Sequence, residues 1–102
     1  MLKLVEDKLE DIIALCKEHN VVSIALFGSA SDDRMHSASD IDFLVQFSED
    51  IAVIDYPDNY FSLLEQLEKL MGYKIDLVSL KSLKNPILLE EINQSKVVLY
   101  AA

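Results

Sequence analysis

The sequence VVSIALFGS, residues 21–29, and the sequence DIDFLVQF, residues 40–47, decide how this chain folds. Each stretch contains a run of β-branched and apolar residues that is long enough for a buried strand. The first run stops at Gly28-Ser29, and the polar, small residues 30–39 separate it from the second. That connection is shorter than a helical crossover between parallel strands requires, so we expect the two strands to be antiparallel neighbours.

Helical and strand-like patterns flank this pair on both sides. We expect helices over residues 2–19, over 59–71 with Asp58 as N-cap and Gly72 as the end, and from Asn85-Pro86 to about Ser95. The apolar residues expected to face inward from the second helix are Phe61, Leu64, Leu67, Leu70 and Met71. An acidic loop over 48–57 and further strands over 73–80 and 96–101 complete the pattern. The order predicts an α/β (α+β) fold, a mixed four-stranded sheet with helices packed on it, in one domain over residues 1–102.

Composition and charge exclude several classes of protein. The net charge is −9, from 18 acidic and 9 basic residues, so we expect no direct nucleic-acid binding. Cys16 is the only cysteine, which excludes an intrachain disulfide, and its place in an apolar stripe predicts a buried thiol. The charged first turn and the lack of an apolar stretch of about 18 residues predict a soluble, cytoplasmic protein without membrane association.

Asp40-Ile41-Asp42 is the strongest chemical signal. Aspartate is disfavoured in strands, and two of them on one face stand about 6.5–7 Å apart by strand rise. Their repulsion, about 2–3 kcal/mol at an effective dielectric near 20, is relieved by a divalent cation with a preference for oxygen, such as Mg²⁺. The alternative is a solvated edge strand whose polar face carries two acids.

Two further features strengthen the metal interpretation. Gly28-Ser29 ends a buried strand, where a bare backbone and a hydroxyl can approach phosphate oxygens, although many such pairs are ordinary turns. Asp76 lies in the middle of the strand-like run YKIDLVSL. It is either a structural residue, exposed or paired with Lys74, or a functional one, acting as a general base or as a ligand to a second metal. In an antiparallel pair, Gly28-Ser29 and Asp40 lie at the same end of the sheet.

The combination of Gly28-Ser29, Asp40-Ile41-Asp42 preceded by Ser39, and a later strand with Asp76 resembles the minimal nucleotidyltransferase (MNT) family of the DNA polymerase beta superfamily. The resemblance extends over nearly the whole chain. It implies that Asp40, Asp42 and Asp76 are catalytic and bind metal, as Mg²⁺, on the triphosphate of a nucleotide, with Asp76 assisting the acceptor hydroxyl. It also implies that a nucleoside monophosphate is transferred with loss of pyrophosphate.

The nucleotide-binding residues implied by the resemblance are Gly28, Ser29, Arg34 and Ser39. Family loops commonly read Gly-Ser-x-Ala-Arg-Gly, whereas this chain has Ser31, Asp32 and Asp33 at the matching positions. Arg34 is therefore the candidate for the missing cation, while His36 is expected to be solvated.

The partner is also implied by the resemblance. Small members of the family accompany a helical HEPN-domain protein as the antitoxin of a toxin–antitoxin pair, and some adenylylate a tyrosine of the toxin. The favoured function is thus AMP transfer from ATP to a hydroxyl of a partner protein. The alternatives are a non-catalytic module that neutralises its partner by contact, and transfer to a small molecule. The apolar C-terminal strand also leaves a homodimer open.

Overall fold

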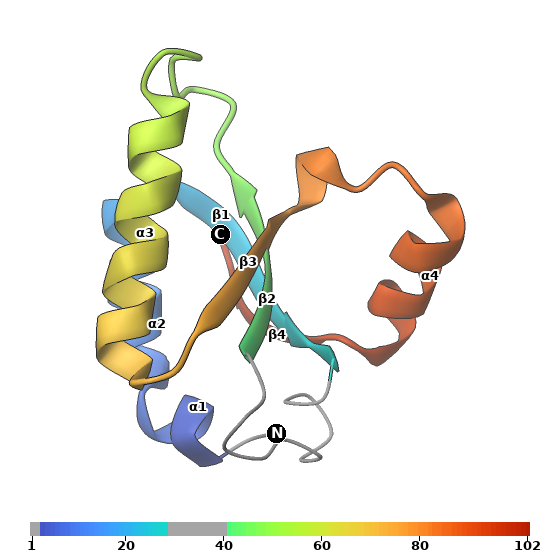
Figure 1. The fold of residues 1–102 in the computed structure, drawn as a ribbon, viewed down its shortest axis with the longest axis horizontal. Helices are drawn as coiled ribbons and strands as arrows, with labels where there is room; N and C mark the ends of the chain where they lie inside the picture. Colours follow the sequence, from blue (N-terminus) through green and yellow to red (C-terminus); the bar gives the residue numbers. More distant parts are fainter. Residues whose placement is uncertain (1–2, 29–40) are drawn as a thin grey trace.

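The computed structural model describes residues 3–28 and 41–102 (Figure 1). The helices are α1 (Lys3–Asp7), α2 (Leu9–Glu18), α3 (Tyr56–Met71) and α4 (Pro86–Ser95), with a short 3₁₀ turn, η2 (Leu80–Ser82). The strands are β1 (Val21–Phe27), β2 (Ile41–Phe47), β3 (Ile75–Ser79) and β4 (Val97–Ala101). The loop predicted over residues 30–39 lies outside the described residues.

The four strands form one mixed sheet in the order β3-β2-β1-β4. β1 pairs antiparallel with both β2 and β4, whereas β3 runs parallel to β2. The parallel pair is possible because α3 returns the chain between its two strands, as a parallel connection requires. The mixed sheet and the antiparallel pairing of the first two strands are therefore confirmed.

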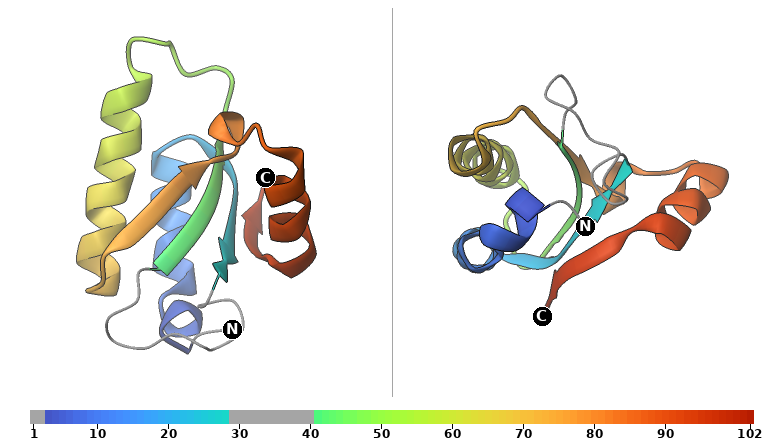
Figure 2. Two further views of the ribbon diagram at one scale, coloured as in Figure 1. Left: turned by 45° about the vertical axis from the view of Figure 1, so that its right-hand side comes forward. Right: turned by 90° about the horizontal axis from the view of Figure 1, so that it is seen from below.

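One face of the sheet carries the core. Figure 2 shows α2 and α3 side by side along that face, while α4 lies on the other side of the sheet. Phe43 of β2 is fully buried between the sheet and these helices, as are Ile12 of α2 and Leu67 of α3. In α4 only Ile92 is buried, so this helix is far less integrated into the core than α2 or α3. None of the described helices is long and apolar enough to cross a membrane.

Several predicted boundaries were wrong. The N-terminal segment forms two helices that break at Lys8, whose backbone angles are φ −105° and ψ 6°. α3 begins at Tyr56, so Pro57 lies in its first turn, a position that proline tolerates, and Asp58 is not its N-cap. The third strand covers only Ile75–Ser79, because the chain turns into η2 after it.

The predicted inward face of α3 is confirmed at four positions and wrong only at Phe61: Leu67 and Met71 are buried, and Leu64 and Leu70 pack against the core. Leu63, Leu67 and Met71 are buried, a spacing of four residues that follows one face of the helix. Phe61 is 62% exposed because it lies two residues, about 200°, away from that face at 3.6 residues per turn. Gly72 ends the helix as predicted, with φ 71° in the left-handed region.

His19 was not recognised from the sequence as a structural residue. Its side chain is 6% exposed, with Nδ1 2.7 Å from the Leu15 carbonyl and Nε2 3.0 Å from Ser62 Oγ. Its own carbonyl accepts a hydrogen bond from Asn59 Nδ2 at 2.7 Å. His19 therefore joins the end of α2 to α3, and its buried ring nitrogens are satisfied by the protein.

Cys16 is fully buried, as predicted, and burial raises the pKa of its thiol from an ordinary value of 9.0 to about 12. Between these values the unfolded thiol ionises while the folded thiol keeps its proton. The stabilising contribution is therefore complete below pH 9 and is lost as the pH rises toward 12. We expect the free energy of unfolding to fall by up to about 1.4 kcal/mol per pH unit from this group. Urea unfolding of the wild type and Cys16→Ala between pH 8 and 10.5 checks this prediction. If the free energy of unfolding depends on pH with the same slope in both proteins, the prediction is contradicted.

Candidate functional site

Asp42 and Asp76 lie side by side on the face of the sheet away from α2 and α3. They are register partners in the parallel pair of β2 and β3, where neighbouring strands are about 4.8 Å apart. Alternation along the two strands gives the face of each residue: Ile41, Phe43 and Leu77 are buried in the core, so the aspartates between them point the other way. Asp42 is half-buried and Asp76 is exposed.

Gly28 lies against the first of these carboxylates. Phe27 is the register partner of Asp42 across β1 and β2, and Gly28 follows it with φ +72°. A Cβ atom at position 28 would lie 2.5 Å from Asp42 Oδ2 and 3.4 Å from its Cγ. Both the backbone angle and the close approach require glycine. The strand end, the glycine and the two carboxylates thus form one local arrangement, the carboxylate site.

The other predicted site residues lie outside the described part of the chain: they are Ser29, Arg34, Ser39 and Asp40. His36 lies outside it too. Asp40 remains a prediction as a third carboxylate, and so does the phosphate-binding role of Ser29.

The two adjacent carboxylates repel each other, and a cation between them removes that repulsion. Within residues 3–28 and 41–102, no three histidine, cysteine, aspartate or glutamate side chains gather closely enough to hold a metal ion. Magnesium commonly takes only one or two protein carboxylates and completes its shell with water and substrate phosphates. The donor set of Asp42 and Asp76, beside a glycine that leaves room for the Asp42 carboxylate, therefore fits such an ion.

The charge of Asp76 also reaches Tyr60 of α3. Burial raises the pKa of the Tyr60 phenol, and the negative charge of Asp76 and the nearby Tyr56 raise it further. Tyr60 donates its hydroxyl proton to the Leu77 carbonyl in β3, and Tyr56 hydrogen-bonds Ser79 at 2.9 Å. These bonds attach α3 to β3, the strand that carries Asp76, and help to keep that strand in position.

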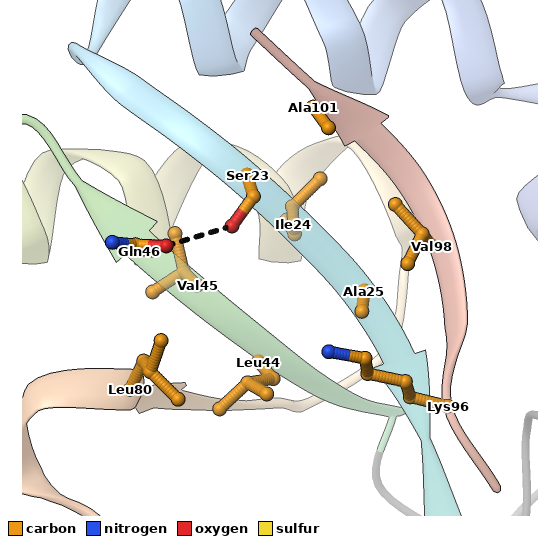
Figure 3. Close-up of a pocket in the computed structure, with 10 residues that line it drawn as sticks. All are labelled: Ser23, Ile24, Ala25, Leu44, Val45, Gln46, Leu80, Lys96, Val98 and Ala101. Atoms are coloured by element: carbon orange, nitrogen blue, oxygen red, sulfur yellow. Dashed lines mark hydrogen bonds between the residues drawn. The ribbon is translucent and has the colours of Figure 1, made fainter. Parts of the chain in front are cut away.

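A groove continues along the sheet from the carboxylate site (Figure 3). It has a volume of about 240 Å³. Ala25 and Leu44 lie on its floor, each two residues along its strand from Phe27 or Asp42. Lys96, from the segment just before β4, also lines it. The sequence alone did not single out Lys96, because its neighbours follow from the long-range pairing of β4 with β1.

Comparison with known families matches residues 10–102 to the family described as polymerase beta, nucleotidyltransferase. The chain therefore belongs to the polymerase beta nucleotidyltransferase family. The match covers every strand of the sheet, including the two that carry Asp42 and Asp76.

Individual relatives are similar along most of their length. A protein of Methanocaldococcus jannaschii named as a protein adenylyltransferase is 39% identical over 82 residues, 78% of each chain. The protein adenylyltransferase MntA of Thermococcus cleftensis is 33% identical over 92 residues, 85% of this chain and 89% of its own. Among solved structures, one described as a minimal nucleotidyltransferase superposes with a TM-score of 0.79 at 28% identity, covering 95% of both chains. A toxin–antitoxin structure with AMP-PNP gives a TM-score of 0.72 at 26% identity, covering 92% of this chain and 73% of that chain.

Proposed function

We propose that residues 1–102 act as one Mg²⁺-dependent nucleotidyltransferase domain that transfers AMP from ATP to a hydroxyl group of a partner protein. The observation that carries the proposal is the register pairing of Asp42 with Asp76 on the open face of the sheet, with Gly28 against the Asp42 carboxylate. Support for the substrate comes from relatives named as protein adenylyltransferases.

The proposed chemistry divides these residues into a metal-binding group and a phosphate-binding group. Asp42, together with Asp40 and Asp76, would hold Mg²⁺, which neutralises phosphate charge when bound. Gly28 and Ser29, with Arg34 and Ser39, would hold the triphosphate through backbone and side-chain donors. The acceptor oxygen attacks the α-phosphorus as the bond to the β-phosphate oxygen breaks, pyrophosphate leaves, and Asp76 takes the hydroxyl proton.

We further propose that the partner is a helical protein of the HEPN type and that the pair forms a toxin–antitoxin system in the cytoplasm. Support comes from the similarity to the toxin–antitoxin structure with AMP-PNP, which is above 25% identity over most of the chain. A homodimer through β4 also remains a prediction. β4 is at an edge of the described sheet, and light scattering of the purified chain measures the oligomeric state.

Binding of Mg²⁺-ATP tests the nucleotide site directly. At 100 times its dissociation constant, a ligand raises the free energy of unfolding by about 2.7 kcal/mol. We expect this stabilisation in the wild type and its loss in Asp42→Asn, because the amide cannot replace the negative charge that the cation needs. The matched control is Asp58→Asn, an exposed aspartate in the first turn of α3, which should respond like the wild type. An equal response from Asp42→Asn and the wild type would contradict the proposal.

A contact-only antitoxin is the second candidate, and exposed apolar side chains favour it. Val53 is 91% exposed, Ile54 85% and Phe61 62%, all near the start of α3. Such residues are often covered by a partner. In that case the wild type would show no response to Mg²⁺-ATP but would still bind its helical partner.

A further inference from the structure

The groove beside the carboxylate site has the dimensions of part of a nucleotide. Its volume of about 240 Å³ is below the roughly 300–1,000 Å³ of pockets that hold a complete drug-sized ligand. It is lined mainly by aliphatic side chains, and Figure 3 places Leu44 and Leu80 along one side and Val98 on the other. A flat aromatic ring that covers this floor would remove apolar surface from water.

The groove is aligned with the carboxylate site. Asp42, Leu44 and Gln46 follow one another at intervals of two residues on the same face of β2, so Gln46 lies about 13 Å from Asp42 along the strand. Ser23, the register partner of Gln46, has its Oγ 3.5 Å from Gln46 Oε1. The far end of the groove therefore offers hydrogen-bonding groups at the distance that separates the phosphate end of a nucleoside phosphate from the outer edge of its base.

Lys96 lies at the end of the groove nearest the carboxylate site. Leu26 pairs with Val97, so by continuation of the register Lys96 lies next to Phe27, in the row of residues that contains Asp42 and Asp76. Figure 3 shows its side chain reaching across the groove toward the side that carries Leu44. Within the part of the chain that the structure describes, its ammonium group has no hydrogen-bond or ion-pair partner. A cation in this position is available to a phosphate oxygen of a ligand held at the carboxylates.

We propose that this groove is the subsite for the nucleotide base, with adenine preferred, and that Lys96 contacts the phosphates at its entrance; the proposal rests on the proposed function. The aliphatic floor holds the faces of the ring. Gln46 reads its edge, because a glutamine amide both donates to and accepts from the adjacent nitrogens of adenine. Lys96 supplies positive charge to the triphosphate from the segment just before β4.

An acceptor side chain is the competing occupant of the groove. A tyrosine with its hydroxyl at Asp76 would place only carbon atoms along the ring and would leave Ser23 and Gln46 without a polar ring atom to bind. The polar far end of the groove therefore favours a base, whose outer edge carries donors and acceptors.

Binding of three ligands to the full chain separates the possibilities: Mg²⁺-ATP, Mg²⁺-GTP and Mg²⁺-tripolyphosphate, which lacks a base. Val98→Trp fills the groove from a residue that is 55% exposed, so the fold is retained. Gln46→Ala removes the reader of the base edge, with Gln94→Ala on α4 as its matched control. Lys96→Met removes the cation, with the exposed Lys17→Met on α2 as its control.

We expect the wild type to bind ATP at least about tenfold more tightly than tripolyphosphate and more tightly than GTP. Val98→Trp should weaken the binding of ATP by about tenfold and leave the binding of tripolyphosphate unchanged. Gln46→Ala should remove the preference for ATP over GTP. Lys96→Met should weaken both ATP and tripolyphosphate by about tenfold. Both control variants should bind like the wild type.

The failure of this inference is distinct from the failure of the proposed function. If the wild type binds none of the three ligands, the proposed function itself is wrong and the inference falls with it. If the ratio of the dissociation constants for ATP and tripolyphosphate is the same in the wild type and in Val98→Trp, the groove does not hold the base. If Val98→Trp leaves ATP binding intact but stops transfer to the partner, the groove holds the acceptor and the base assignment is overturned.

Discussion

Asp76→Asn is expected to slow AMP transfer by about 10²–10⁴-fold, the contribution typical of a positioned general base. The substitution keeps the shape of the side chain and removes its charge and its ability to take a proton. Asp76 is exposed on β3, so the change leaves no buried group unsatisfied and the fold should persist. The rate is measured with ATP labelled at its α-phosphate, as label transferred to the helical partner or released to water as AMP.

The control for this variant is Asp58→Asn, which removes one carboxylate from the exposed first turn of α3. It should transfer AMP at the wild-type rate, because it changes the net charge by the same amount away from the carboxylate site. A rate for Asp76→Asn within threefold of the wild type would show that the carboxylate at position 76 takes no part in the reaction.

Gly28→Ala should reduce transfer about 10²-fold, the typical cost of misplacing a catalytic group by about an ångström. The added Cβ would lie 2.5 Å from Asp42 Oδ2, so the carboxylate must move away from its position beside Asp76. The left-handed backbone at φ +72° adds a stability cost of about 1–2 kcal/mol. Activity and the free energy of unfolding should therefore both fall.

Gly72→Ala separates these two effects. Gly72 has nearly the same backbone angle, φ +71°, but a Cβ there meets no atom within 4 Å. The variant should lose the same 1–2 kcal/mol or so of stability while its transfer rate at 25 °C stays at the wild-type value. Equal losses of activity in the two variants would mean that strain alone, and not the displacement of Asp42, explains the effect.

The sequence predicted the parts of the fold that depend on local patterns. The short connection between the first two strands led to the antiparallel pair, and the two-residue spacing of Asp40-Ile41-Asp42 led to carboxylates on one face of the second strand. That these two residues are register partners could not be predicted, since it depends on how α3 brings β3 back beside β2.

Features set by contacts between distant segments were missed. Phe61 was expected inward because it is apolar, yet the inward face is fixed by Leu63 and Leu67, which pack against the sheet. From the sequence, His19 is an ordinary residue at the end of a helix. Its structural role depends on the hydrogen bond of its ring with Ser62, which is 43 positions away in the sequence. Lys96 acquires neighbours on the open face only through the pairing of β4 with β1.

The parallel alignment of β2 with β3 makes the chemistry depend on the packing beneath it. Side chains alternate between the two faces of a strand, so a shift of β3 by a single residue would turn Asp76 inward and bring Ile75 or Leu77 to the surface. Burying a lone carboxylate while exposing an aliphatic residue is costly in both respects. The buried aliphatic residues of β3 therefore set the alignment of the two carboxylates. The same contacts that stabilise the fold keep Asp76 beside Asp42. Selection for activity would then constrain positions that no substrate ever touches.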